Sequence, residues 1–283
     1  MRIVSFNINS IRARPHQLEF IRDTIKPDII GLQETKVHDD EYPIDVVSDI
    51  GYHSEYWGQK GHYGVALLSL DKPIEVVKGF NNDTDEDQKR FIQAKFRFGN
   101  EEITVMNGYF PQGENRTHET KFPKKIKFYK DLKKHIGEIN EKEKNLIVMG
   151  DFNVAPQEID IGIGENNKKR WLRDGKCAFL PEEIALWESI KDIGFVDTWR
   201  EFYPEENSIY SWFDYRSRMF EDNPKRGLRI DHILLSNNLR DQLKSASICY
   251  ETRGLNKPSD HCPVWILSLI HIPSPRDKRQ SRM

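Results

Sequence analysis

The sequence predicts a single α/β domain in which packed β-sheets are covered by helices. Short runs rich in β-branched residues recur along the chain, amphipathic helical segments lie between them, and no long linker separates the two kinds of segment. The chain has 283 residues, of which 37 % are hydrophobic and 11 % aromatic, so one domain can bury a sizeable core. We expect this domain to comprise residues 1–267.

The predicted strands are short apolar runs, and polar residues follow most of them. They are Ile3–Phe6, Ile29–Leu32, Tyr63–Ser69, Phe91–Phe98, Ile103–Met106, Leu146–Met149, Leu228–Leu235 and Val264–Leu267. Runs of this length with flanking Gly and Pro are typical of buried or half-buried strands.

Three segments between these strands have the spacing of amphipathic helices. Pro15–Ile25 and Lys124–Ile139 carry apolar residues at intervals of three and four, and Pro181 is well placed to open a helix over Pro181–Ile193. Segments 81–89, 113–123 and 160–165 are expected to be surface loops, and 167–173 a basic loop with one aromatic residue.

The last stretch, residues 268–283, differs from the rest because Pro, Ser and Arg replace apolar periodicity. We interpret it as a disordered or appended tail. The whole chain has a formal net charge of −2, and without this stretch acidic residues exceed basic ones by five. Overall charge therefore does not predict a nucleic-acid-binding protein, although a local basic patch could bind DNA and a cation could offset clustered acids.

The cysteines and the hydropathy of the sequence indicate the cellular compartment in which the protein is expected to reside. Cys177, Cys249 and Cys262 are scattered and form no CxxC pair, which favours a reducing environment. No run reaches the roughly 18 to 20 apolar residues of a membrane span. We therefore expect a cytoplasmic protein.

Carboxylate and amide side chains at the strand ends indicate a site. Taken singly, Asn7, Glu34 and Asp231 have ordinary explanations as a turn former, a loop cap and a satisfied buried acid. Taken together, they are harder to dismiss, because strands of one sheet bring their ends close together. A cluster of carboxylates would repel itself without a cation, and oxygen ligands suit Mg²⁺ or Mn²⁺ rather than zinc.

The segment KPSDHCPV places Asp260 directly beside His261, between Pro258 and Pro263. Neighbouring side chains in a strand point to opposite faces, whereas the two prolines disfavour a regular strand. We predict a bend through which both side chains serve one site.

Six motifs in a fixed order carry a family resemblance. They are FNIN (6–9), LQETK (32–36), NGYFPQG (107–113), GDFN (150–153), GLRIDHIL (227–234) and SDHCPV (259–264). With them the chain resembles the endonuclease/exonuclease/phosphatase superfamily, and within it the exonuclease III family of apurinic/apyrimidinic endonucleases. The resemblance covers Met1 to about Leu267 and departs from the family where Pro224 and Lys225 lengthen a loop. It implies a four-layer α/β sandwich of two packed, mostly antiparallel mixed sheets flanked by helices.

The resemblance also implies roles for the residues at the strand ends. The implied metal ligands, for Mg²⁺ with Mn²⁺ as a substitute, are Asn7, Glu34, Asp151, Asn153 and Asp260. The implied catalytic residues are Tyr109, Asp151, Asn153, Asp231 and His261. Asp151 would position or deprotonate the attacking water, and Asp231 would fix the tautomer of His261. Tyr109 would donate to the phosphate or stabilise charge as phenolate. Whether Asp151 or His261 is the general base, and whether one or two metals work, stays open.

On the substrate side, the resemblance implies a monomer acting on double-stranded DNA at abasic sites and 3′ ends. Trp212, Phe213 and Leu228 would form a small apolar pocket for a flipped sugar without a base. Contacts with the DNA backbone are expected from Arg90, Gln112, Lys121 and Arg216. Most lysines of 121–134 are interpreted as the solvated face of a helix.

The implied reactions are 3′→5′ exonuclease cleavage, incision 5′ of an abasic site, and removal of 3′-terminal phosphate or phosphodiester groups. Two alternatives remain. A phosphatase of inositol phosphates or lipid head groups would share the metal site but not the apolar pocket. A non-catalytic DNA-binding module of the same fold should lack some of the metal ligands.

Overall fold

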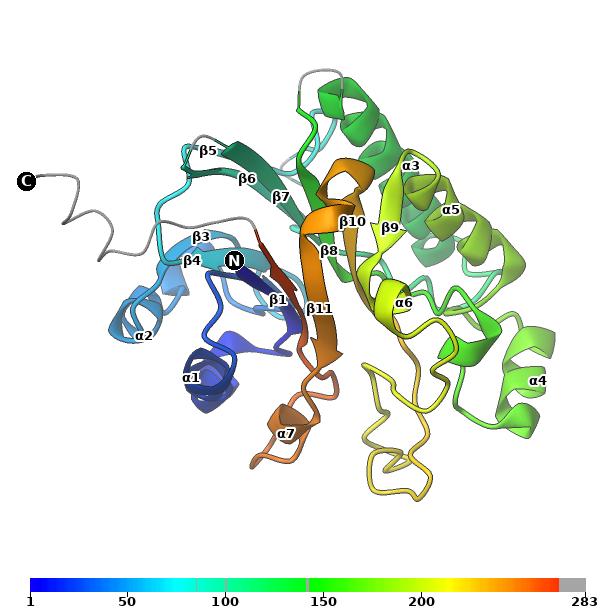
Figure 1. Cartoon of the computed structure of the whole chain (residues 1–283). Helices are drawn as coiled ribbons and strands as arrows, with labels where there is room; N and C mark the ends of the chain where they lie inside the picture. The colour runs from blue at the N-terminus through cyan, green and yellow to red at the C-terminus, as the bar shows by residue number, and fades with distance from the viewer. Residues whose placement is uncertain (85, 100, 141–142, 270–283) are drawn as a thin grey trace, which may run out of the picture.

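Two six-stranded sheets form the centre of the structure, a computed structural model that describes residues 1–84, 86–99, 101–140 and 143–269 (Figure 1). The first sheet has the order β11 (Leu243–Ile248), β12 (Val264–Ser268), β1 (Arg2–Asn7), β2 (Ile29–Gln33), β4 (Val65–Ser69) and β3 (His53–Trp57). The second has the order β5 (Glu75–Lys78), β6 (Phe91–Phe98), β7 (Glu101–Tyr109), β8 (Leu146–Asp151), β10 (Asp231–Ser236) and β9 (Phe195–Asp197). Within these sheets β1–β2 and β7–β8 pair in parallel and the other neighbours are antiparallel.

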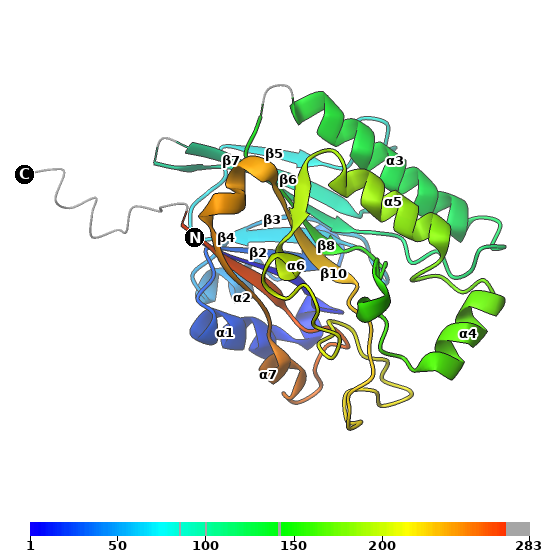
Figure 2. The ribbon, with the colours of Figure 1, turned by 45° about the vertical axis from the view of Figure 1, so that its right-hand side comes forward.

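Helices cover the outer face of each sheet, as Figures 1 and 2 show from two directions. Helices α1 (Pro15–Thr24) and α2 (Ile44–Asp49) lie on the first sheet, and α3 (Lys121–Asn140) and α5 (Pro181–Lys191) on the second. Helices α4 (Glu165–Arg173), α6 (Thr198–Phe202) and α7 (Tyr250–Arg253) belong to the connections between β8 and β9, between β9 and β10, and between β11 and β12. Four 3-10 turns complete the pattern at Ile11–Ala13, Asp39–Glu41, Glu158–Asp160 and Asn237–Gln242. The predicted four-layer sandwich is thus confirmed.

Three layers of apolar side chains lie between the four layers of helices and sheets. In β1, Ile3 packs between the sheets while Val4 and Phe6 pack beneath the helices of the first sheet. This alternation follows from the two-residue period of a strand. Tyr129 and Leu132 of α3 belong to the third layer, which covers the second sheet. Each sheet is therefore buried on both faces, and its central strands read as nearly continuous apolar runs.

Polar side chains link the two sheets inside the central layer. Gln33 Nε2 donates to Asn107 Oδ1 at 2.6 Å, and Asn107 Nδ2 donates to the carbonyl oxygen of Leu32 at 2.9 Å. A side chain at Gly31 would place its Cβ 2.4 Å from Met149 Cε and 2.8 Å from Asn107 Oδ1. Glycine is thus required for the close approach of the sheets, and this approach lets the buried amides satisfy one another.

The structure corrects several expected element boundaries. Segment 167–173 is part of helix α4, not a loop, and α3 begins at Lys121, inside the segment expected to be a loop. The strand expected from Leu228 begins at Asp231. Ser268 ends β12 although the tail was expected to begin there, and residues 270–283 lie outside the described residues.

Further elements were not predicted at all. They are strands β3, β5, β9 and β11 and helices α2, α4, α6 and α7. These elements are short or have polar, partly exposed sequences such as HSEYW in β3, so they lack a strong apolar period. Within the described part of the chain, no helix combines the length and apolar character needed to cross a membrane.

Candidate active site

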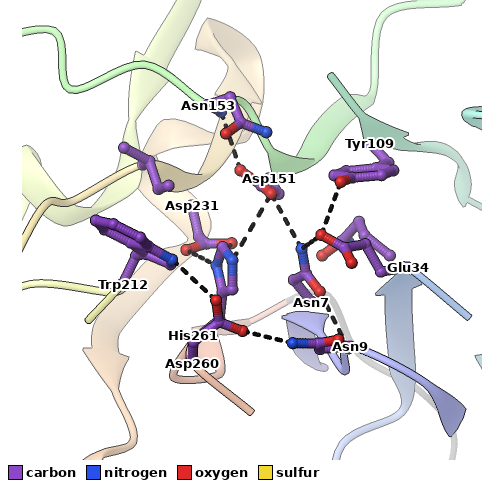
Figure 3. A network of polar contacts seen from close by, with 12 residues as sticks. Asn7, Asn9, Glu34, Tyr109, Asp151, Asn153, Trp212, Asp231, Asp260 and His261 are labelled. Carbon is purple, nitrogen blue, oxygen red and sulfur yellow. Dashed lines mark hydrogen bonds and ion pairs between the residues drawn. The ribbon is translucent and has the colours of Figure 1, made fainter. Parts of the chain in front are cut away.

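Polar residues from both sheets meet where their central strands end. In the second sheet Asp151 is paired in register with Tyr109 of β7 and with Asp231 of β10, so the three residues lie side by side. In the first sheet β1 ends at Asn7 and β2 is followed by Glu34. The Asn7 amide joins the two groups, because its Nδ2 donates to Glu34 Oε1 and to Asp151 Oδ2, each at 3.0 Å (Figure 3).

Glu34 accepts hydrogen bonds and faces a cation. Tyr109 donates its hydroxyl to Glu34 Oε1 at 2.7 Å, and Lys36 Nζ lies 2.8 Å from Glu34 Oε2. Burial raises the pKa of Tyr109 well above its usual value, and the charge of Glu34 raises it further. The phenol therefore stays protonated and acts as a hydrogen-bond donor at neutral pH.

Arg90 supports Tyr109 from behind. Its guanidinium lies 4.5 Å from the ring centre of Tyr109 and 4.4 Å from that of Tyr63, and Nη1 donates to the Tyr109 carbonyl oxygen at 3.0 Å. The side chain is buried, and such cation–π stacking is favoured when the cation is desolvated. Arg90, predicted as a substrate contact, thus lies against the phenol that would bind the substrate.

Asp151 is almost fully buried and its orientation is fixed at both oxygens. Oδ1 accepts the backbone N–H of Asn153 at 3.0 Å, and Oδ2 accepts from Asn7 and lies 3.9 Å from His261 Nε2. Burial raises the pKa of Asp151 to about 7, although the nearby charge of His261 lowers it. A carboxylate with this proton affinity suits proton transfer near neutral pH.

Asn153 lies beyond Asp151 in a left-handed backbone conformation, with φ of 53°. Its side-chain Nδ2 donates to the carbonyl oxygen of Phe110 at 3.0 Å. The residue thus contributes its backbone N–H to Asp151 and leaves Oδ1 of its amide as an acceptor near the carboxylate (Figure 3).

His261 comes from the bend that the two prolines predict, because residues 258–263 form no strand and β12 begins at Val264. His261 Nδ1 donates to Asp231 Oδ2 at 2.9 Å, as expected. Burial would lower the pKa of His261, but the charges of Asp231 and Asp151 outweigh it and raise the pKa to about 10. The ring is therefore an imidazolium at neutral pH, and its Nε2 lies on the side of Asp151, 3.9 Å from Oδ2.

Asp260 lies on the other side of the same bend. Its carboxylate accepts from Asn9 Nδ2 at 2.8 Å and from Trp212 Nε1 at 3.1 Å, so its partners are not Asn7 or Glu34 (Figure 3). Burial raises the pKa of Asp260, but His261 and these hydrogen bonds lower it below its usual value. Asp260 is thus ionised and holds the indole of Trp212 in place.

Most of these catalytic candidates line a cleft of about 270 Å³ together with several apolar side chains. The polar lining comprises Glu34, Tyr109, Gln112, Asp151, Asn153, Asp260 and His261. The remaining lining comprises Trp171, Lys176, Cys177, Ala178, Trp212, Leu228 and Ile230. Trp212 and Leu228 thus line the same cleft as the predicted catalytic residues Asp151 and His261.

Phe213 does not line the cleft, which corrects its predicted role as a pocket wall. The side chain is fully buried, and its ring packs at 5.0 Å against Phe220 and at 5.6 Å against Tyr250. Neighbouring side chains in an extended segment point to opposite sides. Because Trp212 points into the cleft, Phe213 points into the core.

Five lining residues were not predicted as site residues, namely Trp171, Lys176, Cys177, Ala178 and Ile230. Trp171 of α4 stacks on Phe179, and Lys176 Nζ lies 3.6 Å from the centre of a Trp171 ring. Trp171 falls within 167–173, the expected basic loop with one aromatic residue, but no pattern in the sequence assigned Trp171 or Lys176 to the cleft.

A second groove of about 290 Å³ adjoins the cleft through Gln112. Arg90, Gln112 and Lys121 line it together with Tyr63, Gln88, Pro111, Gly113, Thr120 and Lys124. Lys121 is exposed and paired with Glu114, and Arg216 is exposed on a different loop, where its backbone N–H donates to Asp214. The structure therefore groups Arg90, Gln112 and Lys121 but places Arg216 apart from both cavities.

The donors around the cleft suit a hard cation. Glu34 and Asp151 present carboxylate oxygens on either side of the Asn7 amide, whose Oδ1 accepts from the backbone N–H of Asn9, and oxygen ligands are the type that Mg²⁺ and Mn²⁺ favour. Among the described residues, Asp151, Asp231 and His261 also form a group that could hold a metal ion, with ligand atoms within 4.8 Å of one another. Asp231 and His261 already bond to each other, whereas Glu34 and Asp151 could hold a cation between them beside Asn7.

Two mixed sheets that converge on carboxylates, a phenol and an imidazolium define a class of hydrolytic enzymes rather than a binding module. Residues 4–261 match the Endonuclease/Exonuclease/phosphatase family, and the chain belongs to this family. It is 51 % identical over 265 residues to exodeoxyribonuclease III of Haemophilus influenzae, covering 94 % of this chain and 98 % of that protein.

Solved structures agree with this assignment. The 3′ phosphatase NExo from Neisseria, solved bound to a product DNA hairpin, superposes with a TM-score of 0.86 at 33 % identity and covers 95 % of this chain and 99 % of its own. An AP endonuclease from Archaeoglobus fulgidus superposes with a TM-score of 0.84 at 33 % identity and the same coverage.

Proposed function

We propose that this protein is a metal-dependent DNA repair nuclease of the exodeoxyribonuclease III type. It cleaves the phosphodiester 5′ of an abasic site, removes nucleotides from 3′ ends of duplex DNA and clears 3′-terminal phosphate groups. We further propose that it works as a monomer in the cytoplasm. The relatives named above are, by name, an exodeoxyribonuclease, a 3′ phosphatase bound to a DNA hairpin and an AP endonuclease, and these names support the proposed activities on DNA.

One observation carries this proposal: Tyr109, Asp151 and Asp231 stand side by side in register, His261 bonds to Asp231, and the cleft lined by Tyr109, Asp151 and His261 is also lined by Trp212 and Leu228. The row supplies donors for a phosphate and an acceptor for a proton of water. The apolar wall of Trp212 and Leu228 suits a sugar that has lost its base. Neither set of residues alone would distinguish a nuclease from a phosphatase.

In the proposed reaction His261 Nε2–H and the Tyr109 hydroxyl donate to non-bridging oxygens of the phosphate. Asp151 accepts a proton from water as the water oxygen bonds to phosphorus and the bond from phosphorus to the leaving oxygen breaks. The charged imidazolium favours this assignment of the base to Asp151, because a protonated ring cannot accept the proton. Donors aimed at developing charge in a buried site stabilise the transition state.

We propose Mg²⁺ as the cofactor, with Mn²⁺ as a substitute. Glu34, Asn7 and Asp151 would hold it, with Asn153 and Asp260 as more distant candidates. When bound, the cation would neutralise charge on the phosphate and the leaving oxygen. The oxygen-only donor set supports this choice.

Specificity for abasic sites rests on the shape of the apolar wall. Trp212 is fixed by its hydrogen bond to Asp260, and Leu228 is joined to it by backbone pairing. A complete nucleotide would overfill the space between these side chains and the catalytic row. Gln112, Lys121 and Arg90 would track the backbone in the adjoining groove, giving sequence-independent, salt-sensitive contacts.

A gel assay tests the proposal against the phosphatase alternative. The protein is incubated with an abasic duplex, a blunt duplex and an inositol phosphate, each with Mg²⁺ and with EDTA, beside Glu34→Ala. We expect Mg²⁺-dependent cleavage of both duplexes, little phosphate release from the inositol phosphate, and a higher Mg²⁺ requirement in the variant. Release from the inositol phosphate without DNA cleavage would refute the proposal in favour of a phosphatase.

A further inference from the structure

A buried ion pair lies directly behind the wall of the cleft. Lys125 of α3 and Glu183 of α5 have fully buried side chains, and Lys125 Nζ lies 2.5 Å from Glu183 Oε1. The other lysines of the helix, Lys121, Lys124, Lys127, Lys130, Lys133 and Lys134, are exposed. The prediction of a solvated helix face is therefore correct for those six lysines and wrong for Lys125, whose side chain points into the protein interior.

This pair ties together three loops that build the cleft. Lys125 Nζ donates to the carbonyl oxygen of Asn153 at 2.8 Å and contacts that of Gln112 at 3.4 Å. Glu183 Oε2 accepts the backbone N–H groups of Ala178 at 2.9 Å and Leu180 at 2.8 Å. Lys125 and Glu183 thus hold together the loop after β7, the loop after β8 and the loop before α5.

The loops also contact one another through their backbones. The N–H of Ala155 donates to the carbonyl oxygen of Ala178 at 2.7 Å, and that of Cys177 donates to the carbonyl oxygen of Glu114 at 3.1 Å. Gln112, Asn153, Cys177 and Ala178 line the cleft. A displacement of one loop would therefore move lining residues contributed by the others.

Asn153 connects the pair to the catalytic carboxylate. Lys125 holds the carbonyl oxygen of Asn153, and the N–H of the same residue holds Asp151 Oδ1 at 3.0 Å. A buried ion pair is weak evidence for stability, because apolar residues of similar size often stabilise as well or better. The buried pair is better explained by a need to hold these loops in position than by a gain in stability.

We propose that Lys125 and Glu183 are positioning residues that orient Asp151 through Asn153 and set the wall of the cleft between Gln112 and Ala178. This inference rests on the proposed nuclease function, since turnover of DNA is its readout. Neither residue touches the substrate. Small errors of position in a catalytic group lower turnover strongly while leaving substrate binding intact.

The test is the double variant Lys125→Met/Glu183→Gln, which removes both charges while the introduced glutamine oxygen can still accept from the N–H groups of Ala178 and Leu180. We expect a folded protein whose kcat on an abasic duplex is lower by about tenfold or more, with KM nearly unchanged. Leu132→Ala is the matched control, since Leu132 is a core residue of the same helix. It should lower the melting temperature while keeping kcat.

A folded double variant with wild-type kcat would overturn the inference, as would a loss of kcat equal to that of Leu132→Ala at equal loss of melting temperature. If the double variant does not fold, Lys125→Arg decides. It keeps the charge, but its planar guanidinium cannot repeat the lysine contacts in a closed space. Reduced kcat in this variant supports the inference and full kcat overturns it. A wild-type protein that cleaves no DNA would instead refute the proposed function.

Discussion

Asp151 is oriented by groups from three separate segments, and this makes it the most informative single residue. Asn7, Asn153 and His261 surround its two oxygens. Sequence patterns identified all four residues as members of one site, because each stands at or near a strand end. The pairing partners of each oxygen could not be predicted, since they depend on the register between β8 and β10 and on the approach of the first sheet.

Replacement of Asp151 tests its role as the proton acceptor. Asp151→Asn keeps the size of the side chain but removes the basic oxygen, so turnover of an abasic duplex should fall by about 100-fold or more with the DNA dissociation constant nearly unchanged. Single-turnover rates and binding titrations measure the two effects. Normal turnover in this variant would show that another group accepts the proton.

Trp212 and Phe213 are adjacent in the sequence but should respond in different ways to truncation. Trp212 lines the cleft, so Trp212→Ala should lower kcat/KM on abasic DNA by about tenfold with a small effect on stability. Phe213 is core, so Phe213→Ala should lower the free energy of unfolding by about 3–5 kcal/mol.

Kinetics and chemical denaturation of both variants check this separation. Unchanged abasic cleavage in Trp212→Ala would contradict the assignment of the apolar wall. An unchanged unfolding free energy in Phe213→Ala would contradict the placement of its ring in the core.

At the scale of elements, sequence patterns predicted the central strands and the three long helices, and they missed the edge strands. The central strand β2 is buried throughout and mostly apolar, whereas the edge strand β3 has the sequence HSEYW and is partly exposed. Helix α4 was missed because Trp171 is its single buried residue. The predicted bend at Pro258–Pro263 was confirmed, since the backbone chemistry of proline acts locally.

Helix α3 also carries a buried histidine that should make stability depend on pH. His135 Nε2 lies 2.7 Å from Gln93 Oε1, and its ring packs at 5.3 Å against Phe91. Burial lowers the pKa of His135 below its ordinary value of 6.5, although Glu138 and Glu143 oppose the shift. In the folded state the ring is thus neutral at pH values where the unfolded chain already binds a proton.

The sign of the effect follows from this difference. The contribution of His135 to stability is fully present above about pH 6.5 and is lost as pH falls from there towards the lower pKa of the folded state. His135→Gln should reduce the slope of unfolding free energy against pH in that window by at most about 1.4 kcal/mol per unit. Urea unfolding across the window measures it, and Ile136→Val, which should lower stability without changing the slope, is the control.

At the scale of the whole molecule, the site exists because two sheets approach closely enough for Asn7 of one to bond Asp151 of the other. The approach depends on Gly31, where a Cβ would lie 2.4 Å from Met149 Cε and 2.8 Å from Asn107 Oδ1. This distance could not be predicted from sequence, since it results from side chains far apart in the chain. Gly31 and Asn107 nevertheless lie within or beside the predicted strands.

Gly31→Ala therefore tests whether the sheet spacing controls the site. The added methyl group must displace Met149 or the Asn107 amide, which should lower the free energy of unfolding by about 1–3 kcal/mol. Because Asn107 bonds Gln33 and Leu32 across the sheets, we also expect lower turnover on abasic DNA, measured in the folded variant below its melting temperature. Ala94→Gly, a change in the same central layer that removes volume instead of adding it, serves as the comparison. Equal stability and turnover in Gly31→Ala and wild type would mean that the sheets can separate without disturbing the bond between Asn7 and Asp151.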